Sequence, residues 1–248
     1  MKKKWPYVAF PILGVLFCLW YVKAATFDIV YTDYIRLVNT YLPDVMNPDK
    51  FFVPDVLTRI PVNYLGRIIN VVFFHYSTTF DMVLGVLGLG AAGGLMAYYC
   101  RNYSVGWFWV MLLSILMFGL NKWEMLTNGT GWVHFLAIAC FLYHYLVLDR
   151  VWYGTEKKYD RVKLMVLPFV VTLGVAGPYC AIYTVVLVLS YGFCMIAKAR
   201  RAGKYEMIHG KNAKKQPLEL GDAKKTRWGK MDVRYLLYMV CAGIPLFL

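Results

Sequence analysis

FDMVLGVLGLGAAGGLMAYYC, residues 80–100, decides the fold class of this chain. It is almost wholly apolar, and about 20 such residues let one helix cross the hydrocarbon core of a membrane. Five glycines recur along it: Gly85, Gly88, Gly90, Gly93 and Gly94. Because small residues let helix backbones approach closely in lipid, we expect this helix to pack tightly against its neighbours.

Six more apolar stretches are interpreted as further spans. They cover about residues 5–24, 104–120, 132–148, 164–177, 179–197 and 235–248. The chain is 60% hydrophobic over 248 residues, whereas a soluble domain is about 45–50% apolar. The sequence therefore predicts an all-α, polytopic transmembrane helical bundle of about seven spans, formed by a single domain over residues 1–248.

Three span boundaries carry further information. Gly177-Pro178 separates two spans, and we expect a turn there because proline lacks a backbone donor and disfavours helix at the preceding residue. The first span follows a basic head, but its apolar core exceeds the usual 7–15 residues of a secretory signal, so we interpret it as retained. The last stretch spans roughly 21 Å, short of the ~30 Å core. We therefore expect an N-terminal fragment of a longer protein, with a partial last helix as the alternative.

Positive charge is concentrated on one side of the predicted spans. The N-terminus and every second connection hold 21 of the 27 Lys and Arg residues. The opposite connections hold the other six: Lys23, Arg36, Lys50, Arg59, Arg67 and Lys122. Basic residues beside membrane spans stay on the cytoplasmic side, so we predict a cytoplasmic N-terminus and outward-facing connections at 25–78 and 121–131.

The same bias accounts for the formal net charge of +13, so we predict no nucleic-acid partner. The predicted partner of the basic connection 198–234 is membrane lipid. Anionic headgroups attract each Lys or Arg near the membrane surface by about 1 kcal/mol.

The long outer connection 25–78 carries most of the functional information. Five of the fourteen acidic residues lie in it: Asp28, Asp33, Asp44, Asp49 and Asp55. Apolar residues recur at helical spacing over 31–42 and again over 56–74. The stripe of the second segment is Leu57, Ile60, Tyr64, Ile68 and Val71. We expect two amphipathic helices that lie along the membrane surface with aromatic side chains at headgroup level.

This layout resembles that of the GT-C superfamily of polytopic membrane glycosyltransferases, including uncharacterised members from Gram-positive bacteria. The resembling parts are Phe27-Asp28, Thr32-Asp33-Tyr34, the two expected surface helices and Trp123-Glu124. Members place their essential acid in the first outer loop and use a polyprenyl-phosphate-linked sugar as donor. The resemblance implies a cell-envelope transferase of the plasma membrane, with a lipid-linked sugar donor and a glycan or polymer acceptor as partners.

Transfer from such a donor requires a base for the acceptor hydroxyl and cations beside the departing phosphate. The predicted catalytic residues are Asp33 as the first choice for the base, then Asp28, with Glu124 from the later loop. The predicted substrate-binding residues are Arg36, Arg59, Arg67 and His75. Many members of the superfamily carry two adjacent acids in this loop, but Asp28 and Asp33 lie five positions apart. We therefore predict no cofactor; a divalent metal stays open as an alternative, although no motif supports it.

Simpler roles stay open for the same residues. Asp33 and Arg36 have the spacing of a surface ion pair on one helix face. The alternative for Arg59 and Arg67 is to snorkel at the bilayer edge, and Glu124 also suits a turn or a helix cap. In the span 132–148, His134 and His144 lie too far apart for a metal pair, and we expect His144 to be hydrogen-bonded inside the bundle.

Two other functions stay open. A transporter or flippase commonly has charges within its spans and broken helices at mid-membrane. The predicted spans have almost no ionisable groups between their ends, apart from the two histidines, which argues against ion-coupled transport. A non-catalytic integral membrane assembly partner would need only the glycine-rich span and the basic inner loop.

Overall fold

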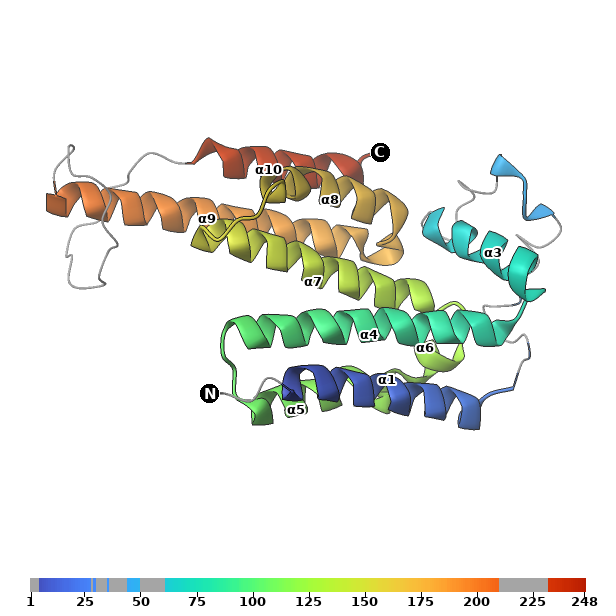
Figure 1. The fold of residues 1–248 in the computed structure, drawn as a ribbon. Coiled ribbons are helices and arrows are strands. Elements are labelled where there is room, and N and C mark those ends of the chain that lie inside the picture. Colours follow the sequence, from blue (N-terminus) through green and yellow to red (C-terminus); the bar gives the residue numbers. More distant parts are fainter. Residues whose placement is uncertain (1–4, 28, 30–34, 36–43, 50–60, 210–231) are drawn as a thin grey trace.

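The computed structural model describes residues 5–27, 29, 35, 44–49, 61–209 and 232–248, without the side chains of 202–209. These residues form helices, turns and short connections, and no strand occurs among them. The bundle formed by the described residues consists of helices that run along a common direction (Figure 1). They are α1 (Pro6–Ala25), α4 (Thr78–Asn102), α5 (Trp107–Phe118), α7 (Trp132–Tyr153), α8 (Asp160–Gly174), α9 (Cys180–His209) and α10 (Val233–Gly243).

The remaining helical segments lie near the ends of the bundle helices. They are α3 (Pro61–Phe74), the short α6 (Trp123–Thr127) and single 3₁₀ turns at Leu120–Lys122, Gly177–Tyr179 and Ile244–Leu246. The turn at Gly177–Tyr179 confirms the break predicted at Gly177-Pro178. Gly177 takes a φ of 48° there, a conformation that glycine adopts at little cost.

Within the described part of the chain, five helical segments are long and apolar enough to cross a membrane. They are Pro6–Ala25, Thr78–Asn102, Trp107–Thr127, Trp132–Tyr153 and Gly177–Arg201. The other two predicted spans correspond to α8, which has 15 residues, and to the short apolar helix Val233–Leu246. At 1.5 Å per residue α8 is roughly 22 Å long, less than the ~30 Å core. That these two helices cross the membrane stays a prediction.

Where they are described, the connections that the charge pattern grouped together lie at the same end of the bundle. The N-terminus and the connections at 103–106 and 154–159 meet at one end, which we call the basic end (Figure 1). The helices α3 and α6 and the turn at Gly177–Tyr179 lie at the other, which we call the α3 end. Helix direction and charge therefore alternate together, while the assignment of the basic end to the cytoplasm stays a prediction.

The outward surface of the bundle is apolar. Trp20 of α1, Leu116 of α5 and Phe193 of α9 are 63%, 62% and 68% exposed. Soluble monomers rarely expose contiguous apolar patches of more than a few hundred Å². A surface of this kind suits contact with lipid. It agrees with the presence, among the residues described, of five helical segments that are long and apolar enough to cross a membrane.

The centre of the bundle is the close pair α4 and α7. A Cβ added at Gly88 would lie 3.2 Å from the backbone nitrogen of Leu136. The close helix approach expected of the glycine-rich span is therefore confirmed. The helix α7 also joins two apolar cores, since Phe135 packs with Leu89 and Phe118 near α1, while Val147 belongs to the core formed with α8, α9 and α10.

Candidate functional site

The helix α3 buries its polar side and exposes its apolar side. Its buried residues are Asn63, Tyr64, Gly66, Arg67 and Asn70. Its exposed large side chains are Leu65, Ile69, Val72, Phe73 and Phe74. A helix on a soluble domain does the reverse. In a membrane, lipid solvates an outward apolar face and polar groups must be satisfied inside the protein, so α3 is suited to lie between lipid and a polar interior.

The exposed stripe differs from the one predicted for residues 56–74. Tyr64, which was placed in the apolar stripe, is 1% exposed, and its hydroxyl donates to the backbone oxygen of Asn47 at 2.5 Å. The face turned outward is shifted by one position, to Leu65 and Ile69. The helix is rotated in this way because the Tyr64 hydroxyl has its hydrogen-bond acceptor, the Asn47 carbonyl, within the protein. The segment 31–42 lies outside the described residues apart from Ile35, and the membrane-surface position of both helices stays a prediction.

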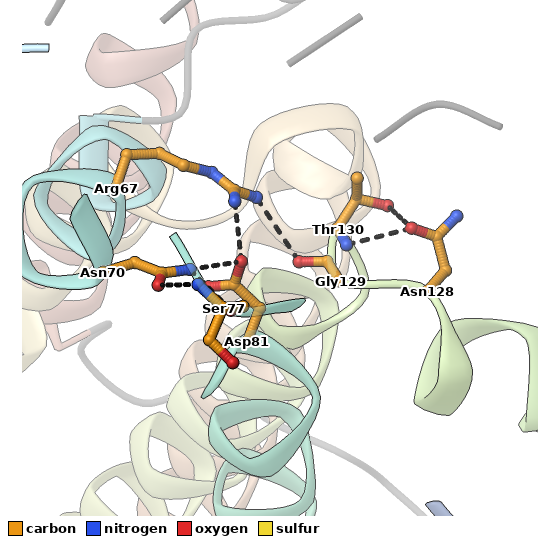
Figure 2. A network of polar contacts seen from close by, with 7 residues as sticks. All are labelled: Arg67, Asn70, Ser77, Asp81, Asn128, Gly129 and Thr130. Atoms are coloured by element: carbon orange, nitrogen blue, oxygen red, sulfur yellow. Dashed lines mark hydrogen bonds and ion pairs between the residues drawn. The ribbon is translucent and has the colours of Figure 1, made fainter. Parts of the chain in front are cut away.

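Arg67 and Asp81 form a buried ion pair between α3 and α4 (Figure 2). Arg67 Nη1 lies 2.6 Å from Asp81 Oδ2, and the two side chains are 2% and 0% exposed. Asn70 Nδ2 donates to the same oxygen at 3.0 Å. Arg67 Nη2 donates to the backbone oxygen of Gly129 at 3.5 Å. A single buried charge would cost several kcal/mol, so each of these two ions requires the other.

Asn70 also closes the turn between α3 and α4. Its Oδ1 accepts from the backbone nitrogen of Ser77 at 2.9 Å, and its Nδ2 donates to the Ser77 oxygen at 2.9 Å. In this turn His75 and Tyr76 take φ angles of 52° and 66°. Left-handed backbone costs a non-glycine residue about 1–3 kcal/mol and persists where neighbouring contacts hold it. The Asn70 amide supplies such contacts.

The segment Asn128 to Thr130 forms the third side of the network (Figure 2). Asn128 is buried, and its Oδ1 accepts from the backbone nitrogen and the hydroxyl of Thr130, both at 3.1 Å. This is the side-chain-to-backbone turn that asparagine commonly forms. The turn presents the Gly129 carbonyl to Arg67, and so connects α3 to the start of α7.

Trp132, the first residue of α7, seats α3 by direct packing. A Cβ added at Gly66 would lie 2.5 Å from Trp132 Cζ2, so only glycine allows this approach. The helix α3 is therefore held by an ion pair to α4, by a hydrogen bond to the connection before α7, and by an aromatic ring. The arrangement positions α3 against α4 and the start of α7.

Of the predicted catalytic carboxylates, Glu124 lies among the described residues, and within them its side chain forms no hydrogen bond or ion pair with this network. Asp28, Asp33, Arg36 and Arg59 lie outside the described residues, so their roles stay predictions. Glu124 is exposed in the first turn of α6, and its backbone oxygen accepts from the nitrogen of Asn128 at 2.9 Å.

Arg67 and His75 lie in different surroundings. Arg67 is 1% exposed, which excludes a snorkelling position for its guanidinium. A phosphate would reach Arg67 only by displacing Asp81 or the Gly129 carbonyl. His75 is exposed in the α3–α4 turn, at the surface of the network.

A second buried polar group lies between α7 and α9. His144 Nε2 is 2.5 Å from the Tyr191 hydroxyl, and His144 Nδ1 is 2.7 Å from the Tyr183 hydroxyl. Because Tyr191 donates to the Leu164 oxygen at 3.4 Å, it accepts from His144 Nε2–H, and Tyr183 donates to Nδ1. One neutral tautomer satisfies the whole chain of bonds. The expected hydrogen-bonded position of His144 inside the bundle is confirmed.

Sequence reasoning did not single out Asp81 or Asn70. The available signal was the spacing of Asn63, Arg67 and Asn70, which at i, i+4 and i+7 share one helix face. A second signal was the carboxylate of Asp81 at the start of an apolar span, where an ionisable group needs a partner.

Among the described residues, no three His, Cys, Asp or Glu side chains gather in a way that could hold a metal ion. Comparisons of the chain with protein-family models, with curated proteins and with solved structures gave no match. The site is therefore interpreted from its own chemistry.

Proposed function

We propose that this protein is a membrane glycosyltransferase. It transfers a sugar from a polyprenyl-phosphate carrier to a glycan or polymer acceptor at the α3 end. The observation that carries the proposal is α3, with its apolar side outward and its polar side bound to Asp81 through Arg67. A helix of this kind suits the boundary between lipid and water, which is where a lipid-linked sugar presents its phosphate. The end of α1 and the helix α3, which flank the acid-rich connection in the sequence, both lie at this end (Figure 1).

In this proposal the chemistry belongs to the acid-rich connection, and the buried network supports it. Asp33, or else Asp28, takes the proton of the acceptor hydroxyl. Arg36 and Arg59 bind the phosphate by charge-assisted hydrogen bonds. Arg67 stays bound to Asp81 and holds α3 in place. Seven spans with a cytoplasmic N-terminus complete the proposal, because they put the α3 end on the outer face.

The test is donor binding and single-turnover transfer by the purified full chain in detergent. We expect Asp33→Asn to bind a polyprenyl-phosphate sugar as the wild type does, while transfer slows by at least about 100-fold because the base is lost. We expect Arg36→Ala to weaken binding by roughly tenfold or more, because a charge-assisted hydrogen bond is lost.

Two exposed residues at the same end provide matched controls. Asp49→Asn removes a carboxylate from the same connection, and Lys23→Ala removes a cation from the end of α1. Both should leave binding and transfer unchanged. Failure of the folded wild-type chain to bind the donor would contradict the proposal and favour the non-catalytic assembly partner.

A further inference from the structure

At the basic end, two cavities meet at Trp152. The first, which we call the apolar groove, has a volume of about 470 Å³ and lies between α4, α7 and α9. Its lining includes Met96 of α4, Leu142 and Leu146 of α7, and Phe193 of α9. The second, which we call the charged cavity, has a volume of about 200 Å³ and lies among α7, α8, α9 and α10. Trp152 lines both of them.

The charged cavity has more cations than carboxylates in its lining. Arg161, Lys198 and Arg234 line it together with Glu156 and Asp232. Arg161 Nε donates to Glu156 Oε2 at 2.7 Å, and Arg234 Nη2 lies 2.7 Å from Asp232 Oδ2. Lys198 Nζ stays 3.7 Å from Asp232 Oδ2, beyond direct hydrogen-bond distance. Lys198 therefore shares Asp232 with Arg234, and because three cations face two carboxylates, one positive charge remains in excess.

Two cations lie beside Trp152, and we call this place, where one residue lines both cavities, the junction. Lys198 Nζ lies 5.9 Å from the centre of the Trp152 ring, and Arg201 Cζ lies 5.0 Å from it. Arg201 is exposed, and the Lys198 side chain is 31% exposed. One carboxylate, Asp149, lines the apolar groove, and it accepts a hydrogen bond from the hydroxyl of Tyr103. With the three cations and two carboxylates of the charged cavity, Arg201 and Asp149 bring the count to four cations and three carboxylates, so one positive charge remains in excess.

We propose that this junction binds an anionic phospholipid, with an acyl chain in the apolar groove and the phosphate at Lys198 and Arg201. From the membrane interior to its surface, a phospholipid presents an apolar chain and then an anionic phosphate. The apolar groove and the two cations follow one another in the same order. Basic pockets between membrane helices bind anionic lipid headgroups in this way. The site lies at the opposite end of the bundle from α3, and so is independent of the transferase proposal.

The test is native mass spectrometry of the full chain, offered phosphatidylglycerol and phosphatidylcholine with identical acyl chains. We expect the wild type to retain the anionic lipid in preference. The double variant Lys198→Gln, Arg201→Gln should lower that preference by roughly tenfold. The control is Lys157→Gln, Lys158→Gln, which removes equal charge from an exposed turn at the same end and should leave the preference unchanged.

A third variant, Met96→Trp, fills the apolar groove and should reduce retention of both lipids. Thermal unfolding of each variant checks that the bundle still folds. Equal losses in the two double variants would indicate general surface attraction and overturn the proposal. It is also overturned if the wild type retains both lipids equally, if Met96→Trp changes nothing, or if inorganic phosphate at matched concentration displaces the lipid.

Discussion

Each end of the bundle holds an aspartate with no exposed side-chain surface, and the two are bound in different ways. At the α3 end, Asp81 accepts from Arg67 and Asn70, and both partners are buried. At the basic end, Arg150 donates to both oxygens of Asp160, at 2.7 and 2.9 Å, and its side chain is 15% exposed.

The difference reflects what each pair joins. Arg150 and Asp160 bracket a short turn, and the backbone nitrogen of Lys157 within that turn also donates to Asp160 at 2.9 Å. The hydrogen bonds from Arg150 lower the pKa of Asp160 to about 2. Arg67 and Asp81 instead join two helices in the protein interior. Removal of either side chain there leaves the other charge buried without a counter-charge. The same chemistry therefore stabilises a local turn at one end and positions a helix at the other.

The largest expected effect is that of Arg67→Leu. It leaves the Asp81 carboxylate buried without its cation, and we expect a loss of about 3–5 kcal/mol in the free energy of unfolding. Unfolding by titration with sodium dodecyl sulfate measures this loss. The double variant Arg67→Leu, Asp81→Leu should recover much of it, because no charge is then buried. A double variant as unstable as the single one would refute the importance of this charge balance.

At the basic end, Asp160→Asn should lower stability at neutral pH by about 2 kcal/mol. The pKa of Asp160 is about 2 in the folded chain, below its usual 3.8. A depressed pKa contributes stability that is fully present above the unfolded value and is lost as pH falls through the folded value. The difference between wild type and variant should therefore shrink between about pH 4 and pH 2.

The free energy of unfolding, measured as a function of pH, tests this prediction. The measurement needs a control from an exposed ion pair. Glu156→Gln removes the exposed partner of Arg161 and should change stability little at any pH, because exposed ion pairs contribute little. A stability difference for Asp160→Asn that did not vary with pH would contradict the role assigned to its ionised form.

Each aspartate has a further partner besides its arginine, Asn70 for Asp81 and Lys163 for Asp160. Removal of the buried partner, Asn70, should lower stability more than removal of the more exposed partner, Lys163. Asn70→Ala removes hydrogen bonds to Ser77 and Asp81 in a buried site, and we expect a loss of about 2 kcal/mol. Lys163 lies 3.7 Å from Asp160 with a 37% exposed side chain, so Lys163→Ala should cost a small fraction of that. Detergent-denaturation midpoints compare the two, and the reverse order would show that the network at the α3 end is not the tighter one.

The smallest effects concern the turns beside the two pairs. His75 takes a φ of 52° at the α3 end, and Gly154 takes 72° at the basic end. His75→Gly should raise stability by up to about 1 kcal/mol by relieving strain, and Gly154→Ala should lower it by about the same amount. Thermal unfolding measures both changes. Shifts of the same sign would mean that neighbouring contacts, and not backbone strain, control these turns.

Local sequence features predicted the parts of the fold that depend on local physics. The Gly177-Pro178 turn follows from proline chemistry, and the approach of α7 to Gly88 follows from the missing side chain. The candidate site was harder to predict from the sequence. The spacing of Asn63, Arg67 and Asn70 shows that they share a face of α3, but spacing does not say whether that face meets lipid, water or protein.

By itself, the sequence determined that the described residues are helical, where most of the helices lie, which segments are long and apolar enough to cross a membrane, and that positive charge gathers on alternate connections. Hydropathy and length suffice for this, because lipid requires each span to satisfy its own backbone. Only the tertiary structure decided that α3 faces inward with its polar side, that Arg67 meets Asp81, and that His144 lies between two tyrosines. These contacts depend on how packed helices are rotated and offset, which no local pattern in a single chain specifies.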